Sequence, residues 1–452
     1  MPEKMTETES TLVIIQAIKD GKKGELQAFI DELQPYDIAQ HYHSLPTKHR
    51  NKFLIYLSIE QLTDLLQELG KEEQLAVIYK LGIEKSSKVF DLMQNDDLAS
   101  LLSDLEPEKI DELLSEMKEE ESKAVQNLMN YPPETAGRLM NNRYVWISQH
   151  YTVRQAVDKL KHFAGLAEYL NYLYVIDEQK KLSGVVSYRD LLLADIQDKI
   201  EDIMYRRVVK AEVHTDQEEI AKLISRYDFV SLPIVEPDNT LVGVVTVDDV
   251  IDVMMQEANE DIEKLSASGK AITFTTKPLV AAYRRLPWLI LLLFIGLISG
   301  SIISSFEDTL QSVVALAFFM PLIAGMTGNT GTQSLAVVVR GLVSDDLNLK
   351  QVIKLIFREL WVGIIIGITC GVMISIIAYI WRGNFILGLV VGSSLLITLI
   401  IGTLAGTIIP LILYKLKVDP AVASGPLITT INDILSLLIY FGIATAFITQ
   451  LS

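Results

Sequence analysis

The stretch GPLITTINDILSLLIYF, residues 425–441, places one carboxylate, Asp433, inside an apolar run from about Ala421 to Ile448. A charged side chain at the centre of a bilayer costs roughly 2.5–3.5 kcal/mol on insertion scales. Acids in such segments therefore indicate an ion pathway by default. No Lys or Arg stands in the apolar segments to pair with it. We therefore interpret Asp433 as a residue that recruits a cation.

Four further apolar segments precede this run, and each is long enough to span a bilayer, with roughly 20 residues or more. The five predicted spans are 287–306, 312–339, 359–381, 386–414 and 421–448. Basic residues are concentrated in the loops on one side: Arg284, Arg285, Arg340, Lys350, Lys354, Arg358, Lys415 and Lys417. The opposite loops hold Arg382, Glu307 and Asp308. The positive-inside rule then predicts a multi-pass plasma-membrane protein with a cytoplasmic N-terminus and an external C-terminus.

Two of these spans contain residues that interrupt helices. The second includes MPLIAGMTGNTGTQS, residues 320–334, with Pro321 and three glycines, and the fifth begins near Pro426. Irregular backbone at membrane depth is tolerated only against protein or a water-filled path, so we expect helix breaks along one shared polar pathway. The alternative is a helix-packing motif, because small residues are common at helix interfaces in lipid.

Composition divides the chain into two regimes. Half of the 452 residues are hydrophobic, yet the net charge is −17. Seven of the 57 acidic and nine of the 40 basic residues lie in 279–452, so the first 278 residues carry an excess of 19 acids. An acidic soluble part favours cations over nucleic acid as partners. The N-terminal MPEKMTETES shows no signal peptide, and the single Cys370 excludes an intrachain disulfide.

The N-terminal region repeats every twelve residues. One register is Leu33, Leu45, Leu57, Leu69, Leu81, Met93, Leu105 and Met117, and a second is Leu54, Leu66, Ile78, Phe90, Leu102 and Leu114. This period predicts short helices stacked into a superhelix. Such a superhelix either binds a partner or docks on one, or it is a plain spacer.

Residues 137–257 contain two near-copies, YLYVIDEQKKLSGVVSYRDLLLAD (172–195) and VSLPIVEPDNTLVGVVTVDDVIDVM (230–254). Each predicts two strands and then a helix that begins after a hydroxyl residue, Ser187 or Thr246, with an acid three residues later. Asp190 and Asp249 are therefore helix-capping residues or acids that hold the ribose of a nucleotide. The tandem repeat resembles a pair of CBS domains, and paired CBS domains often bind adenine nucleotides. An acidic run then continues on a predicted helix through about Leu265, either as a solvated face or around a cation.

The order of these parts resembles the MgtE-type magnesium channels. The residues that carry the resemblance are PLIAGMTGNTGTQS (321–334), DPAVASGPLITTINDILSLLIYF (419–441) and TVDDVIDV (246–253). It implies a multidomain membrane protein: an α-helical superhelical N-domain (1–131), α/β tandem CBS domains (132–253, about 137–200 and 201–253), a linking helix (254–278) and an α-helical five-span membrane domain (279–452).

The resemblance also implies roles for individual residues. Asp433 and the carbonyl of Thr429 would hold hydrated Mg²⁺ in a pore on the axis of a homodimer. Asp96 and Asp249 would share a regulatory Mg²⁺, with further regulatory positions at Asp64, Asp216, Glu218, Asp228, Asp252, Glu257, Glu260 and Asp261. ATP would bind at Tyr172, Arg189, Asp190 and Phe229. Ser100 replaces an acid of the family pattern, which makes one regulatory ion weaker or absent.

The implied function is a Mg²⁺-selective channel, not an enzyme, that imports Mg²⁺ and is closed by cytosolic Mg²⁺. A proton- or sodium-coupled secondary transporter of divalent cations is the alternative. An intramembrane metalloprotease would need HExxH in a membrane helix, but all six histidines lie at or before His214. A lone carboxylate in the predicted pathway argues against an anion channel. The sequence contains no GxxxxGK[ST] loop, which a P-loop ATPase pump would need.

Overall fold

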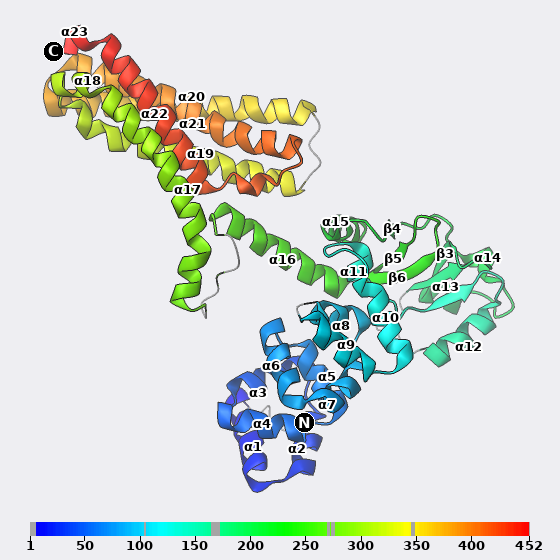
Figure 1. Cartoon of the computed structure of the whole chain (residues 1–452). Coiled ribbons are helices and arrows are strands. Elements are labelled where there is room, and N and C mark those ends of the chain that lie inside the picture. Colours follow the sequence, from blue (N-terminus) through cyan, green and yellow to red (C-terminus); the bar gives the residue numbers. More distant parts are fainter. Residues whose placement is uncertain are drawn as a thin grey trace. The chain divides into compact units, whose positions relative to one another are not determined.

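The computed structural model describes residues 6–103, 105–163, 172–268, 272, 276–344 and 349–451. The chain divides into two compact units, Met1–Met255 and Gln256–Ser452. Figure 1 shows both units, coloured from blue at the N-terminus to red at the C-terminus.

The first part of unit 1 is a stack of short helices, as the twelve-residue period predicts. Its helices are α1 (Glu7–Asp20), α2 (Lys23–Ile30), α3 (Pro35–Ser44), α4 (Thr47–Tyr56), α5 (Ile59–Gln67), α6 (Lys71–Leu81), α7 (Ile83–Phe90), α8 (Asn95–Leu102), α9 (Pro107–Ser115) and α10 (Glu119–Met129). The first leucine register falls at or just after successive helix ends, and every member of the second register is buried. One repeat therefore corresponds to one helix and its turn.

The second part of unit 1 contains two small sheets of the same topology. The first module comprises α11 (Ala136–Leu139), β1 (Trp146–Ser148), α12 (Val153–Phe163), β2 (Tyr172–Ile176), β3 (Leu182–Ser187), α13 (Tyr188–Leu193) and α14 (Ile200–Ile203). The second comprises β4 (Ala211–Glu212), α15 (Gln217–Tyr227), β5 (Ser231–Val235), β6 (Leu241–Thr246) and the start of α16 (Val247–Leu265). In each sheet a parallel pair is followed by an antiparallel hairpin, β1-β2-β3 and β4-β5-β6. The predicted repeat is confirmed.

Equivalent strands of the two modules are in contact. The Tyr174 hydroxyl on β2 shares a 2.8 Å hydrogen bond with Ser231 Oγ on β5. The Leu241 amide donates to the Lys180 carbonyl at 3.1 Å, and Leu182 and Leu241 belong to one buried cluster. The two modules are therefore one packed pair.

Unit 2 contains the end of α16 and a set of long apolar helices. These are α17 (Pro278–Ser305), α18 (Glu307–Ser312), α19 (Leu316–Ser344), α20 (Leu349–Arg382), α21 (Phe385–Lys415), the 3₁₀ turn η1 (Pro420–Val422), α22 (Gly425–Ala446) and α23 (Ile448–Leu451). Within the described residues, α17, α20, α21 and α22 are long and apolar enough to cross a membrane. The 29-residue α19 covers most of the predicted second span, but its polar residues lower its hydropathy. The count of five spans stays a prediction.

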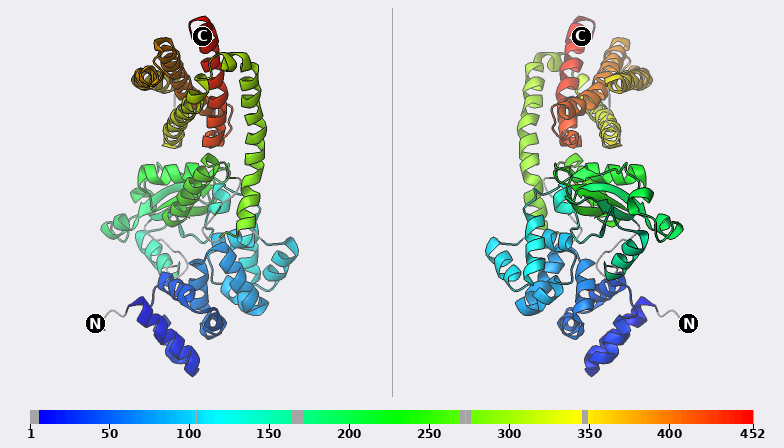
Figure 2. Two further views of the ribbon diagram at one scale, coloured as in Figure 1. Left: turned by 90° about the vertical axis from the view of Figure 1, so that its left-hand side faces the viewer. Right: turned by 90° about the vertical axis from the view of Figure 1, so that its right-hand side faces the viewer.

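The predicted helix breaks are absent from α19 and α22, so that expectation was wrong. Helix α19 runs without interruption through Pro321 and the glycines, and Pro426 stands in the first turn of α22, where its missing N–H is tolerated. The alternative, a packing motif, is what the structure contains. Figures 1 and 2 show α19, α20, α21 and α22 side by side as a bundle, with α17 beside α22.

Candidate functional site

Asp433 lies half-buried in the middle of α22, next to a fully buried amide. The Asn432 side chain is inaccessible to solvent and donates from Nδ2 to the Thr327 carbonyl of α19 at 3.3 Å. Successive residues of a helix are about 100° apart, so Asp433 points away from this contact. Asp433 takes part in no ion pair among the described residues, unlike Lys264 with its two acids and Arg358 with Glu359.

Two glycines of α19 fix how α22 is seated. A Cβ at Gly328 would lie 2.8 Å from Thr429 Cγ2, and a Cβ at Gly331 would collide with Asn432 Nδ2. Thr429 also donates its hydroxyl to the Gly425 carbonyl at 2.9 Å. The glycines therefore let α22 approach closely, and this contact determines the direction in which Asp433 projects.

A second buried carboxylate of the membrane bundle was not singled out from the sequence. Glu359 on α20 is 4% exposed and accepts from Ser334 Oγ of α19 at 3.0 Å. Its other oxygen accepts from the neighbouring Arg358 at 2.9 Å. The adjacent Arg-Glu pair at the start of an apolar segment was the signal for this site. Glu359 is fully partnered, in contrast to Asp433, and it joins α19 to α20.

The end of α16 is bonded to the turn that precedes α22. Lys264 Nζ lies 2.6 Å from a carboxylate oxygen of Glu260 and 2.6 Å from one of Asp419. Burial alone would lower the pKa of Lys264, but hydrogen bonds to Asp419 and Glu260 raise it above its ordinary value. Leu265 packs against a buried cluster that includes Ala421 and Ile428. The predicted regulatory residue Glu260 thus lies at a junction between α16 and the start of α22.

Acids of α8 and α16 face one another within unit 1, and we call this set of five the acid seam: Asp96, Asp97, Asp248, Asp249 and Asp252. Asp96 is buried, and this burial, with the charges of Asp249 and Asp97, raises its pKa well above the usual range. Burial also raises the pKa of Asp97, and the charges of Asp248 and Asp252 add to the effect. Sequence reasoning assigned regulatory roles to Asp96, Asp249 and Asp252. It placed Asp248 only in the acidic run and did not single out Asp97.

Several seam oxygens lack hydrogen-bond partners. Oδ1 of Asp96, Oδ1 of Asp248 and Oδ1 of the neighbouring Asn95 are buried without one. In contrast, Asp249 accepts from Thr246 Oγ1 at 2.6 Å, the capping contact expected of that repeat. Like charges held close together with unsatisfied oxygens are a setting that a cation would stabilise.

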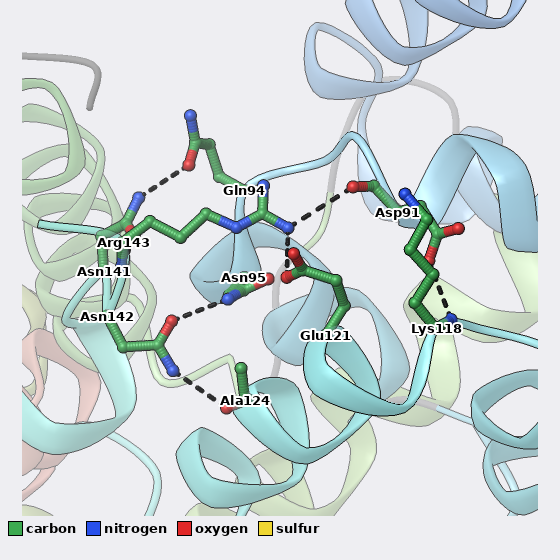
Figure 3. Close-up of polar contacts among 9 residues, drawn as sticks. All are labelled: Asp91, Gln94, Asn95, Lys118, Glu121, Ala124, Asn141, Asn142 and Arg143. Atoms are coloured by element: carbon green, nitrogen blue, oxygen red, sulfur yellow. Dashed lines mark hydrogen bonds and ion pairs between the residues drawn. The ribbon is translucent and has the colours of Figure 1, made fainter. Parts of the chain in front are cut away.

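A polar network holds α8 in place against the segment between α11 and β1 (Figure 3). Asn95 Nδ2 donates to Asn142 Oδ1 at 2.7 Å, and Asn141 Nδ2 donates to Gln94 Oε1 at 2.9 Å. Arg143 completes the network with a 2.6 Å ion pair to Glu121. These contacts lie beside Asp96 in sequence, so they fix its backbone while its carboxylate faces α16.

The remaining predicted regulatory acids do not gather at the seam. Asp216 is the N-cap of α15 and accepts from the Glu218 amide at 2.8 Å, whereas Asp228 caps the other end of that helix with φ 53°. Glu218 pairs with Lys222 at 3.0 Å. Burial, and then the charge of Glu60, raise the pKa of Asp64.

Glu257 and Asp261 are half-buried on the second half of α16. Across the described ranges, no group of three or more His, Cys, Asp or Glu side chains is arranged so that it could hold a metal ion.

The predicted nucleotide residues come from both CBS modules. Ser187 caps α13 and donates to Asp190 Oδ2 at 2.6 Å, so the capping role of Asp190 is confirmed. Tyr172 pairs with Ser187 across β2 and β3, and Arg189 is exposed beside them. Phe229 lies just before β5 and stacks on Tyr227 with ring centroids 5.3 Å apart.

These features define a class: a multidomain membrane protein in which a helical superhelix and a CBS pair precede a bundle of apolar helices. Family models match residues 320–443 (MgtE, divalent cation transporter), 33–134 (MgtE intracellular N domain), and 136–196 and 200–256 (CBS domain). The magnesium transporter MgtE of Bacillus subtilis is 61% identical over 451 residues, which cover 100% of both chains. MgtE of Thermus thermophilus is 35% identical, over 95% of this chain and 96% of the relative.

Solved structures support the same assignment for the soluble part. The soluble part of a magnesium transporter is 33% identical, with a TM-score of 0.54, and covers 56% of this chain and 100% of that one. The cytosolic domain of the Mg²⁺ channel MgtE in complex with ATP is 32% identical, with a TM-score of 0.52, over 54% and 99%. The chain belongs to the MgtE family, whose members are transporters rather than enzymes.

Proposed function

We propose that this chain is a Mg²⁺-selective channel that imports Mg²⁺ down its electrochemical gradient as a homodimer in the plasma membrane. The observation that carries the proposal is its identity of 61%, over its full length, to a relative named a magnesium transporter. The domains would be those expected from the sequence, with the N-terminus cytoplasmic and the C-terminus outside.

Asp433 is the residue that would attract the ion. Mg²⁺ gives up its water reluctantly and is usually held by one or two carboxylates with several waters. One Asp433 from each subunit on a two-fold axis would supply two carboxylates. The lack of an ion pair at Asp433, noted above for the described residues, leaves its charge available, and Thr429 would add a carbonyl one turn earlier.

The acid seam would be the sensor that closes the channel. The support for this role is that Asp96 and Asp248 each keep a buried oxygen without a hydrogen-bond partner, and Mg²⁺ usually takes one or two carboxylates with water as its other ligands. A cation that binds only the compact arrangement shifts the population toward it. The neighbouring charges that raise the pKa of each acid support pairing Asp96 with Asp249, and Asp97 with Asp248 and then Asp252. Asp64, Asp216, Glu218, Asp228, Glu257, Glu260 and Asp261 would contribute weaker sites.

The linking helix would couple the sensor to the pore. Helix α16 begins at the seam acids and ends at Leu265, which packs on residues at the start of α22. Movement of α16 would therefore act on the turn just ahead of Thr429 and Asp433. The CBS pair would also bind ATP through Tyr172, Arg189, Asp190 and Phe229, in line with the relative solved in complex with ATP.

Mg²⁺ flux into liposomes tests the pore assignment. Asp433→Asn keeps the shape of the side chain and removes its charge, and we expect it to abolish most of the flux. Glu307→Gln, at the first residue of α18, is the matched control and should conduct as the wild type does. Undiminished flux in Asp433→Asn contradicts the assignment, and flux that follows an imposed pH or Na⁺ gradient favours coupled transport instead.

The seam is tested separately by the internal Mg²⁺ concentration that halves the flux. Asp96→Asn should raise this concentration several-fold, whereas Glu108→Gln, an exposed acid of α9, should leave it unchanged. An unchanged concentration in Asp96→Asn would remove the seam from the gating mechanism without affecting the pore assignment.

A further inference from the structure

A cavity of about 420 Å³ lies within unit 2 between the end of α16 and the first half of α17, with Pro426 of α22 on its wall. Its polar lining includes Glu263, Ser266 and Ser268 on the α16 side and Arg285 on α17. Neither the pore nor the acid seam uses these residues.

The two sides of the cavity carry opposite charges. Helix α16 ends here, where Ala267 adopts φ 55° and the Ser268 amide donates to the Glu263 carbonyl at 3.0 Å. The negative end of a helix and the Glu263 carboxylate both attract a cationic group. Arg285 offers a planar set of donors that suits a phosphate. Lys264 forms ion pairs with Glu260 and Asp419, but neither Glu263 nor Arg285 takes part in an ion pair among the described residues.

The cavity lies beside residues that flank the start of the predicted first span, at about residue 287. Arg285 and the lining residue Trp288 stand at the start of the apolar part of α17, and tryptophan is enriched at that interface. Beyond them, Leu289, Leu293 and Leu297 form a stripe at i, i+4 and i+8 that is 57%, 64% and 60% exposed. An exposed apolar stripe on α17 therefore continues from a cavity that carries both a negative group, Glu263, and a positive group, Arg285.

We propose that this cavity binds the headgroup of a phospholipid with a primary amine, of the phosphatidylethanolamine type. The ammonium would lie at Glu263 and the end of α16, the phosphate at Arg285, and an acyl chain along the leucine stripe. A volume of 420 Å³ accommodates a headgroup but not two acyl chains, so the chains remain on the lipid-facing side.

The charge arrangement also discriminates among headgroups. Glu263 would repel a headgroup with net negative charge, such as phosphatidylglycerol. A trimethylated amine, as in phosphatidylcholine, has no N–H to donate to Glu263 or to the Ser266 hydroxyl. The site therefore selects for a free ammonium as well as a phosphate, and it holds whether or not the chain transports Mg²⁺.

The test uses the full chain, purified in detergent and delipidated. Thermal unfolding is followed as phosphatidylethanolamine, phosphatidylcholine or phosphatidylglycerol is added, and free phosphoethanolamine serves as the soluble headgroup. We expect phosphatidylethanolamine to stabilise at about tenfold lower concentration than the other two lipids, the effect of about one charge-assisted hydrogen bond. Equal effects of all three lipids, or full stabilisation by phosphoethanolamine alone, would overturn the proposal.

Two variants separate the two ends of the headgroup. Arg285→Gln should weaken binding of both phosphatidylethanolamine and phosphatidylcholine, whereas Glu263→Gln should remove only the preference between them. Lys277→Gln, which removes an exposed charge from the start of α17 outside the cavity, is the control and should behave as the wild type does. If Arg285→Gln does not fold, Glu263→Gln decides alone, and a retained preference refutes the site.

Discussion

Replacement of Gly331 by alanine tests whether the seating of α22 depends on close approach to α19. A Cβ at this position would collide with Asn432 Nδ2 and lie 3.0 Å from Ile428 Cγ2 and 3.2 Å from the Gly402 carbonyl oxygen. Asn432 cannot move away without losing its hydrogen bond to the Thr327 carbonyl. Three neighbours from two helices therefore resist one added methyl group.

The expected magnitude follows from these contacts. Overpacking a well-packed site costs about 1–3 kcal/mol. Loss of the buried hydrogen bond adds about 1 kcal/mol. Alanine gains about 0.8–1.0 kcal/mol of helix propensity over glycine, and a control on the same helix removes this contribution. Gly325 provides that control, because a Cβ there would meet nothing within 4 Å. Gly331→Ala should thus be about 2–4 kcal/mol less stable than Gly325→Ala.

Thermal unfolding in detergent and Mg²⁺ flux in liposomes measure the two consequences. At about 2–4 °C per kcal/mol, the two variants should differ in melting temperature by several degrees. Flux should fall in Gly331→Ala, because Asp433 is carried on the displaced helix. Adding Asn432→Ala should recover part of the stability, since it removes the atom in closest contact. Equal melting temperatures for Gly331→Ala and Gly325→Ala would refute this account of the packing.

Three further predictions concern other contacts. Tyr174→Phe removes the hydrogen bond to Ser231 that joins the CBS modules and should cost about 1 kcal/mol in urea unfolding of the soluble part. Burial lowers the pKa of His41, which is hydrogen-bonded to Thr11. The neutral imidazole therefore contributes to the stability of the fold above pH 6.5, and this contribution is lost as the pH falls through the lower folded-state pKa. The free energy of unfolding should be larger at pH 8 than at pH 5.5, and His41→Asn should reduce that difference. Lys264→Gln should speed amide hydrogen exchange in η1, because it removes the ion pair of modest strength that joins Asp419, at the start of η1, to α16.

The twelve-residue period predicted the N-terminal stack of helices because the residues that end each helix and the residues that fill the core follow the same spacing. Each turn places one residue of the first register at a helix end, and the second register, such as Leu66 and Phe90, fills the common core. The CBS repeats were also predictable from sequence, since each copy has a hydroxyl residue at the start of a helix that donates to the acid three residues later, Ser187 to Asp190 and Thr246 to Asp249. A pattern that repeats along the chain can be recognised from one sequence, because each copy confirms the spacing of the others.

The composition of α19 was misleading for a physical reason. Proline and glycine weaken helices in water, but in a bilayer an unpaired backbone group is so costly that the helix continues through them. Gly328 and Gly331 matter because they have no Cβ, and a Cβ at either position would collide with α22. That role depends on a partner helix about a hundred residues away, which single-sequence reasoning could not identify. The same limit explains why Asp97 and Asp248 were assigned no role, because their importance arises only when α8 faces α16.

The acids of this chain fall into settings that make different demands on a cation. Glu359 is neutralised by Arg358, and Glu260 by Lys264, so a divalent ion gains little there without displacing a base. In the acid seam, Asp96 is buried among like charges, and Asp96 and Asp248 each keep a buried oxygen without a partner, so a divalent ion would stabilise them. Asp433 is the corresponding case in the membrane bundle. If Mg²⁺ both permeates and regulates, the two roles should therefore separate by mutation at Asp433 and Asp96.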